Sequence, residues 1–265
     1  MLKYTVLCVI YNKKCDMSET IKSLLSNSSH VFQGCFEINV WDNSTNNDIS
    51  EYNKYYCNNN NIHYHGSRFN ESLSKVYNIF LENKENDYLI ILDDDTNVSK
   101  KYMEEVDFLA NNIDFQVAVP KINSPEGYLY SPAKFGLVKG VHFIDIKSGY
   151  HNNLVAIASG VFINCISMRD NNISFDEKLS LYGIDTDFFL TLNRKKIKLY
   201  VMNIFVNHDL SYFNEEVNIV KRKRLINHLV SGLYLSKKRG LLYFMLFLIY
   251  LPLVIIKKYK IFIFD

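Results

Sequence analysis

Three apolar runs that alternate with helical segments constrain the fold of this chain more than any other feature. Each run is dominated by apolar and β-branched residues and ends in polar ones: YTVLCVIYN (4–12), CFEINVWDNST (35–45) and DYLIILDDDT (87–96). Such runs are typical of parallel strands that are buried on both faces. Apolar residues at helical spacing follow them, in residues 16–28, 72–84 and 99–112. This alternation predicts an α/β fold with a mostly parallel sheet flanked by helices.

The polar residues that end these runs are expected to lie close together. Asn12 ends the first run, Asp42 follows the apolar part of the second, and Asp93, Asp94 and Asp95 end the third. The carboxyl ends of parallel strands share one edge of the sheet, and ligands bind beyond that edge in folds of this class. The sequence therefore predicts a binding site there.

The three adjacent aspartates repel one another unless a positive charge balances them. An acidic turn that caps the next helix is one explanation, but it accounts for a single carboxylate. The other is a site for Mg²⁺ or Mn²⁺, because these hard cations take oxygen ligands and often bridge one or two carboxylates to substrate phosphates. Asp93 and Asp95 are two residues apart, so in an extended turn they share a face and are the predicted metal ligands.

Charge and cysteine content exclude several classes of protein. A net charge of +2 does not indicate a nucleic-acid partner, and long apolar runs interrupt the basic residues near the C-terminus, so no nucleic acid is expected. Five cysteines without a C-x-x-C pair predict reduced thiols in a cytoplasmic protein. The N-terminal apolar run is too short for a signal peptide and predicts a strand instead.

The second half of the chain is less regular. Residues 124–136 are expected to form a loop, and residues 153–166 two short strand-like halves. A helix is predicted to start near Asp185, and a strand to end at His208.

Residues 1–212 are predicted to form one domain and residues 213–265 a basic, hydrophobic helical tail. The tail run LLYFMLFLIYLPLVII (241–256) has about 16 residues, fewer than the roughly 20 that cross a bilayer, and Pro252 interrupts it. Lys and Arg clusters flank this run, which favours a helix lying at the inner face of the cell membrane, where anionic lipids attract basic residues. A helix packed on the domain and a homodimer interface are the alternatives.

Seven segments carry a resemblance that spans roughly residues 3–210, in this order: TVLCVIYNK, VWDNST, NESLSKVYNIFL, ILDDDT, ASGVFIN, FDEKLSLYGIDTDFFLTLNRKKIKLYV and VNH. The ordered set resembles glycosyltransferase family 2, nucleotide-sugar enzymes of the GT-A fold. It is most similar to the rhamnosyltransferase-like and galactofuranosyltransferase-like members found in bacterial polysaccharide clusters.

The resemblance implies an inverting, metal-dependent glycosyltransferase. The donor would be a dTDP- or UDP-linked sugar, and the acceptor a lipid-linked glycan or oligosaccharide in surface polysaccharide (O-antigen or capsule) synthesis. Mg²⁺ or Mn²⁺ would bind at the D-x-D motif of Asp93 and Asp95, with His208 as a third ligand; an ordinary strand-end histidine is the alternative. The implied nucleotide-sugar-binding residues are Tyr11, Asn12, Asp42, Ser72, Lys75, Asn78, Asp93 and Asp94.

Individual roles follow from the same resemblance. Asp42 would accept a hydrogen bond from the pyrimidine base, although the sequence DNST also predicts an Asx turn. Asp185 would be the general base; because a helix dipole favours a carboxylate at a helix start, simple capping is the alternative. Asp187 and Arg194 are alternates, as supporting residues or a phosphate contact. A single carboxylate on the acceptor side fits direct displacement with inversion.

The chain departs from the family pattern in three places. Ser72 stands where the helix motif has Gly, the region of Phe80 lacks the second Gly of that motif, and Ile184 stands where an acidic residue often precedes the base.

Two other functions fit the sequence less well. A sugar nucleotidyltransferase needs a Gly-rich loop that VIYNKKCDMSE lacks, and a non-catalytic membrane scaffold would not need Asp93, Asp95 and Asp185.

Overall fold

The computed structural model describes residues 2–27, 35–67, 69–124, 127–136, 140–208 and 218–263, without the side chains of 35, 208, 218–221 and 254–263. Its strands are β1 Lys3–Ile10, β2 Cys35–Asp42, β3 His63–Gly66, β4 Tyr88–Asp93, β5 Thr96–Asn97, β6 Val117–Asn123, β7 Leu129–Ser131, β8 Ala133–Phe135, β9 Gly140–His142, β10 Gly149–His151, β11 Leu154–Val155, β12 Val161–Asn164, β13 Leu199–Phe205 and β14 Asn207–His208. Its helices are the 3-10 turn η1 Cys15–Met17 and α1 Glu19–Asn27, α2 Asn47–Asn59, α3 Leu73–Glu82, α4 Lys100–Asn112, α5 Cys165–Asp170, α6 Ile184–Arg194, α7 Asn218–Arg239 and α8 Leu241–Ile263.

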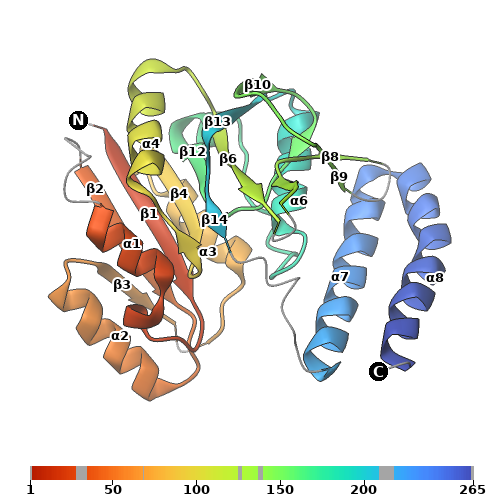
Figure 1. Ribbon diagram of the computed structural model, residues 1–265, viewed down its shortest axis with the longest axis horizontal. Coiled ribbons are helices and arrows are strands. Elements are labelled where there is room, and N and C mark those ends of the chain that lie inside the picture. Colours follow the sequence, from red (N-terminus) through yellow and green to blue (C-terminus); the bar gives the residue numbers. More distant parts are fainter. Residues whose placement is uncertain are drawn as a thin grey trace.

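A central sheet in the order β10-β13-β6-β12-β4-β1-β2-β3 forms the middle layer (Figure 1). The pairs β1–β2, β1–β4, β2–β3 and β6–β13 are parallel, whereas β12 runs antiparallel between β4 and β6. The predicted α/β fold with a mainly parallel sheet is therefore confirmed. β1, β2 and β4 are the three predicted apolar runs, and their carboxyl ends meet at one edge of the sheet.

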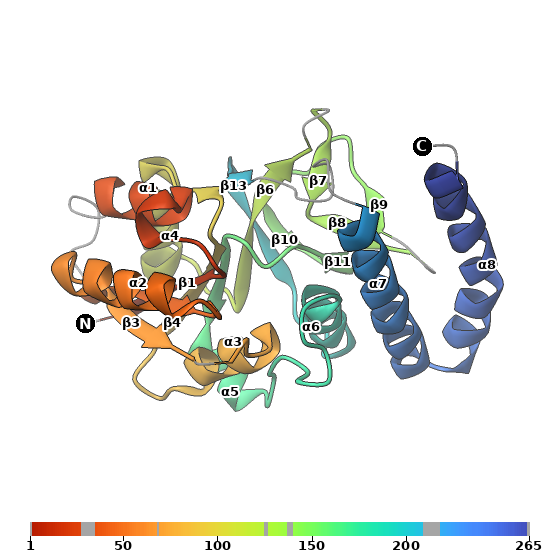
Figure 2. The ribbon, with the colours of Figure 1, turned by 90° about the horizontal axis from the view of Figure 1, so that it is seen from below.

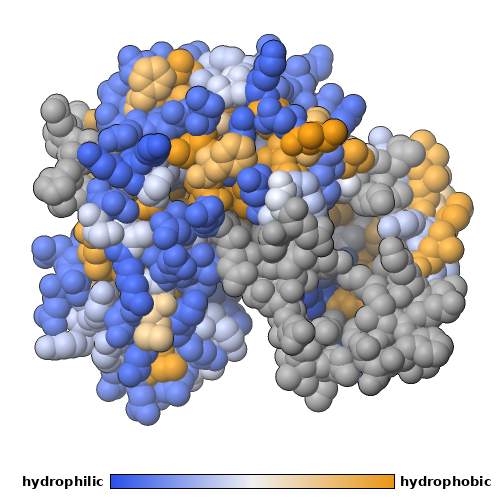
Figure 3. All heavy atoms as spheres, viewed as in Figure 1, coloured by the Kyte–Doolittle hydropathy of each residue, from blue (hydrophilic) through white to orange (hydrophobic). Residues whose placement is uncertain are grey.

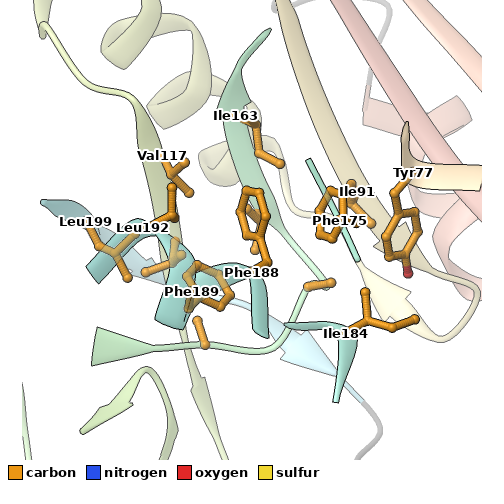
Figure 4. Close-up of a cluster of buried hydrophobic side chains, with 14 of the residues drawn as sticks. Tyr77, Ile91, Val117, Ile163, Phe175, Ile184, Phe188, Phe189, Leu192 and Leu199 are labelled. Atoms are coloured by element: carbon orange, nitrogen blue, oxygen red, sulfur yellow. The ribbon is translucent and has the colours of Figure 1, made fainter. Parts of the chain in front are cut away.

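Helices cover both faces of the sheet (Figure 2). Alternate residues of β1 point to opposite sides, so Val6 and Cys8 pack with α1, α2 and α4, while Leu7 packs with α3, α5 and α6. On the second face, the apolar side of α6 enters the core between β4, β6, β12 and β13 (Figure 4). Phe188 and Phe189 are each 1% exposed there, so burial holds the helix whose first turn contains Asp185.

Several elements differ from the sequence prediction. The helix α2 and the short strand β3 were not predicted, because only Asn53 and Cys57 of α2 are buried and no apolar spacing marks it. Residues 124–136, predicted as a loop, contain β7 and β8. Met17 falls within the predicted helical residues 16–28, but it lies in η1 and is 63% exposed.

The predicted tail is a pair of helices, α7 and α8, linked at Gly240, whose φ is +120°. Leu235 of α7 is 8% exposed and belongs to the core that contains α6. In the part of the chain that the structure describes, no helix is both long enough and apolar enough to cross a membrane. The boundary at residues 212 and 213 lies outside the described residues and stays a prediction.

Candidate active site

The three aspartates form a tight turn at the carboxyl end of β4, and α1 holds its backbone. Asp93 ends β4, Asp94 and Asp95 make the turn, and β5 follows. The Ser18 hydroxyl donates to the Asp94 carbonyl at 2.8 Å. Thr20 Oγ1 accepts from the Thr96 amide at 2.8 Å and also bonds the Asp93 carbonyl. These bonds fix the path of the acidic turn.

Lys13 supplies a positive charge that the sequence analysis did not identify. It lies in the loop after β1, and its Nζ is 2.6 Å from Asp94 Oδ2. The middle carboxylate of the trio is therefore directed to a lysine from the neighbouring strand end. A lysine directly after the first strand was the available signal, because the ends of β1 and β4 are adjacent in a parallel pair.

His208 comes close to the acidic turn through its backbone. β14 pairs antiparallel with β5, which places His208 opposite Thr96, one residue after Asp95. The side chain of His208 lies outside the described residues, so its role as a metal ligand stays a prediction.

The donor atoms at the turn fit a divalent metal that substrate phosphates help to hold. Within the described residues, no cluster of three or more His, Cys, Asp or Glu side chains forms a complete protein site. Asp93 and Asp95 nevertheless supply two carboxylates on one short turn. Because Mg²⁺ and Mn²⁺ commonly bind through one or two carboxylates plus phosphates, this donor set suits them and does not suit a closed zinc site.

Asp185, in the first turn of α6, is linked to the acidic turn through Ala158 and Ser159. Its Oδ2 accepts a hydrogen bond from the Ala158 amide at 3.1 Å, and the Asp93 amide donates to Ser159 Oγ at 3.1 Å. Because Ala158 and Ser159 are consecutive, two adjacent residues hold both the acidic turn and the candidate base. Burial raises the pKa of Tyr77 well above its usual value, and the carboxylates of Asp93 and Asp185 add to that increase, so both carboxylates act on one phenol.

The two alternates to Asp185 have other partners. Asp187 is 3% exposed, and its Oδ2 is 2.8 Å from Lys238 Nζ on α7. Arg194 is exposed at the end of α6 and donates to Thr191 Oγ1 at 2.8 Å. Asp185 is therefore the one of the three that is joined to the acidic turn by hydrogen bonds to the consecutive residues Ala158 and Ser159.

A hollow of about 530 Å³ lies beside the carboxyl ends of β2 and β3, lined by Ser44, Asn47, Ser50, Glu51, Tyr64, Gly66 and Ser67. Asp42 lies beneath it, fully buried, and accepts from the Ser44 amide at 2.9 Å, Asn53 Nδ2 at 2.9 Å and the Tyr64 hydroxyl at 3.1 Å. The bond to Ser44 is the predicted Asx turn. Asp42 thus positions two residues of the hollow, Ser44 and Tyr64, by direct hydrogen bonds.

Asn12 and Tyr11 occupy the end of β1. Asn12 adopts a positive φ of 47°; its amide donates to Ser44 Oγ at 2.9 Å and its Oδ1 accepts from the Thr45 amide at 2.9 Å. These bonds join the loops after β1 and β2 at the rim of the hollow. Tyr11 is 54% exposed beside them.

Three predicted residues lie at or in α3: Ser72, Lys75 and Asn78. Ser72 caps α3 by accepting from the Lys75 amide, and Lys75 Nζ is 2.9 Å from Glu71 Oε2. Asn78 is 5% exposed and bonds the Phe175 backbone twice, as donor at 2.9 Å and as acceptor at 2.8 Å. Asn78 therefore holds the loop before α6, and Ser72 starts the helix.

Comparisons with known proteins agree with this arrangement. The family model described as glycosyl transferase family 2 matches residues 5–170. Among solved structures, S. aureus TarS 1-349 is 15% identical with a TM-score of 0.59, over 89% of this chain and 73% of that one. The same fragment in complex with UDP-GlcNAc is 18% identical with a TM-score of 0.57, over 88% and 67%.

GalNAc-T7 with UDP, GalNAc and Mn²⁺ is 15% identical with a TM-score of 0.60, over 78% of this chain and 44% of that one. No curated protein matches the chain. At these identities the structural likenesses show the fold, and the family model, which covers more than half of the chain, shows the family. The chain belongs to glycosyl transferase family 2 and is a glycosyltransferase with the GT-A fold.

Proposed function

We propose that the protein transfers a sugar, with inversion, from a UDP- or dTDP-linked donor to a glycan acceptor in the synthesis of a bacterial surface polysaccharide. One observation carries the proposal: adjacent residues, Ala158 and Ser159, hold Asp185 and the acidic turn of Asp93–Asp95 at the same edge of the sheet. TarS in complex with UDP-GlcNAc and GalNAc-T7 with UDP, GalNAc and Mn²⁺ support a nucleotide-sugar donor and a divalent cation.

The hollow beside β2 and β3 is the proposed place for the base and ribose of the donor. Its lining of hydroxyls, Glu51 and backbone at Gly66 offers hydrogen-bond partners to a nucleoside. Asp42 acts here by orienting Ser44 and Tyr64, and a direct contact with the pyrimidine would require that Asp42 exchange one of these partners. Asn12 and Tyr11 complete the rim, and Lys13, the residue after Asn12, pairs with Asp94 of the acidic turn.

Asp93 and Asp95 would hold Mg²⁺ or Mn²⁺, with His208 as the third proposed ligand. A bound cation of this kind stabilises the negative charge that develops on the departing diphosphate. The hydrogen bonds from Ser18 and Thr20 keep the turn in place, so the two carboxylates need not be reorganised when the donor binds.

Asp185 is the proposed general base. Its carboxylate takes the proton of the acceptor hydroxyl while that oxygen forms a bond to the anomeric carbon and the bond from this carbon to the diphosphate breaks. The Ala158 amide, which donates to Asp185 Oδ2, orients the carboxylate. With one carboxylate on this side and no covalent intermediate, the anomeric configuration inverts.

A panel of nucleotide sugars tests this function. We expect a UDP- or dTDP-sugar to raise the melting temperature in the presence of Mn²⁺ and to release free nucleotide, because the metal and the hollow both act on the nucleotide part. The measurements are thermal shift and nucleotide release, each repeated with EDTA. Absence of stabilisation by every UDP- and dTDP-sugar with Mn²⁺ present would contradict the proposal.

The α7–α8 tail supports a membrane-associated acceptor. Residues 218–263 contain ten Lys and Arg and no Asp or Glu, a charge pattern that suits anionic lipids. One side of α8 packs on α7, where the ring of Phe247 approaches Gly232. The other side, here called the outer face, is 39–77% exposed and gathers apolar residues along the edge of the molecule (Figure 3): Leu241, Leu242, Met245, Leu248, Ile249 and Leu253.

We expect the double variant Leu242→Glu/Ile249→Glu to lose binding to vesicles of phosphatidylcholine and phosphatidylglycerol. Burial of each side chain in lipid contributes about 1.5–3 kcal/mol, so loss of both weakens binding at least about 100-fold. Co-sedimentation measures the effect, and Phe108→Glu, at a 51% exposed position on α4, is the matched control. Unchanged vesicle binding, or a dimer that the double variant dissociates, would contradict a lipid partner for the outer face.

A further inference from the structure

One lysine ties the helix that carries Asp185 to the tail. Lys238, in the last turn of α7, places its Nζ 2.8 Å from Asp187 Oδ2 and 2.6 Å from Asp176 Oδ2. Asp187 lies in the first turn of α6, two residues after Asp185. On the same helix as Lys238, the Tyr234 hydroxyl donates to Asp176 Oδ2 at 2.7 Å. The tail thus contacts both α6 and the loop that precedes it.

Lys238 and Asp176 favour their charged forms. Burial alone would raise the pKa of Asp176, but hydrogen bonds from Lys238 and Tyr234 lower it to about 2. Burial alone would lower the pKa of Lys238, and its hydrogen bonds to Asp176 and Asp187 raise it instead. The ion pair of Lys238 with Asp176 therefore persists through the pH range in which glycosyl transfer is assayed.

Helix α7 also packs directly on the start of α6. Gly183 precedes α6 with a φ of +80°, and a Cβ at this position would lie 3.1 Å from Leu235 Cδ1 and 3.3 Å from Ser231 Cβ. A side chain at residue 183 would require these atoms of α7 to shift by a few tenths of an ångström. The glycine therefore permits both the left-handed backbone and the close approach of the tail.

We propose that Lys238 is a positioning residue for Asp185 and that α7 is thereby part of the catalytic centre. Ala158 holds the first turn of α6 from the sheet side, through its hydrogen bond to Asp185, and Lys238 holds it from the tail side, through Asp187. The inference rests on the proposed function, because it gives Lys238 this role only if Asp185 is the base. A displacement of about 1 Å at a catalytic group is enough to lower a rate about 100-fold.

A test must separate positioning from stability, because loss of Lys238 leaves the carboxylate of Asp187 buried without its cation, which destabilises the fold. The double variant Lys238→Met/Asp187→Asn removes both charges of the buried pair and so avoids the penalty at Asp187. Asp176 also loses Lys238 in this variant but keeps the hydrogen bond from the Tyr234 hydroxyl. Lys238→Arg keeps the positive charge and can still donate hydrogen bonds to Asp176 and Asp187. Lys100→Met breaks a lysine–carboxylate pair on the exposed face of α4, with Glu104 at 3.6 Å, and is the control for loss of a lysine elsewhere on the protein.

Three measurements on the full chain test the positioning role of Lys238. They are the affinity for UDP with Mn²⁺, the turnover of the nucleotide sugar that the panel identifies as the donor, and the exchange rate of the Ala158 amide proton by NMR. In the double variant we expect unchanged UDP affinity, turnover at least about tenfold lower and faster exchange of the Ala158 amide, because the bond to Asp185 is loosened. Lys238→Arg should recover most of the turnover, and Lys100→Met should match the unmodified protein in all three.

Turnover at the unmodified level in the double variant would overturn the positioning role, whether or not the Ala158 amide exchanges faster. Loss of UDP affinity together with turnover would also overturn it, because the tail would then be supporting the donor site. A panel in which no nucleotide sugar is turned over is a different result: it contradicts the proposed function itself.

Discussion

Replacement of Asp185 by Asn is expected to lower turnover by about 10²- to 10⁴-fold and to leave the affinity for nucleotide with Mn²⁺ unchanged. The magnitude is that of a lost general base. Asn has nearly the same shape and its Oδ1 can still accept the bond from the Ala158 amide, so the first turn of α6 keeps its place while the proton acceptor is removed. Steady-state kinetics of nucleotide release measure turnover, and calorimetric titration with UDP in the presence of Mn²⁺ measures the affinity for nucleotide.

Asp170→Asn is the control for this variant, because Asp170 is an exposed carboxylate at the end of α5. It should retain full turnover. If Asp185→Asn lost nucleotide affinity and turnover together, Asp185 would be a structural residue. If it kept turnover, the proton would have to go to another group, and Asp187, which is held by Lys238, would need to change partners first.

Replacement of Asp95 by Ala is expected to remove the dependence of nucleotide binding on Mn²⁺. Even residues that only support a metal ligand change metal affinity by about 10- to 100-fold, so loss of one of two carboxylate ligands should cost at least about 100-fold. The affinity of the variant for UDP should be the same with Mn²⁺ and with EDTA, whereas the unmodified protein is expected to bind UDP more tightly with Mn²⁺. Calorimetry under both conditions measures this difference, and Asp170→Asn again serves as the control.

A full response to Mn²⁺ in Asp95→Ala would contradict the assignment of the acidic turn as the metal site. If Asp95→Ala kept a full response to Mn²⁺, the metal would bind elsewhere and the acidic trio would be a structural turn stabilised by Lys13. Lys13 contacts Asp94 at 2.6 Å, and the prediction concerns the other two carboxylates, those of Asp93 and Asp95.

The sequence predicted the strands that position the site because those strands are buried on both faces. β1, β2 and β4 have apolar side chains toward both layers of helices, and this produces continuous apolar runs that end where the sheet ends. Asp42 and Asp93 could therefore be placed at one edge without any knowledge of contacts. The helix α2 was not predicted because its buried positions include the polar Asn53, which bonds Asp42 instead of packing in an apolar core.

Contacts between distant segments could not be predicted from local patterns. Lys238 and Asp187 are 51 residues apart, and nothing in either helix marks them as partners. The link between Asp93 and Asp185 through Ser159 and Ala158 also depends on tertiary structure, since β12 and α6 reach that edge by separate routes. Sequence identified Asp185 by resemblance, and only the fold shows that Asp187 faces the tail.

The position of Mn²⁺ in crystals grown with UDP tests the central claim most directly. The account predicts an anomalous manganese signal within coordination distance of Asp93 and Asp95, joined to the diphosphate, with the uridine in the hollow beside Ser44 and Tyr64. Nucleotide bound with no manganese at these two carboxylates would contradict it, and so would a diphosphate located away from the acidic turn.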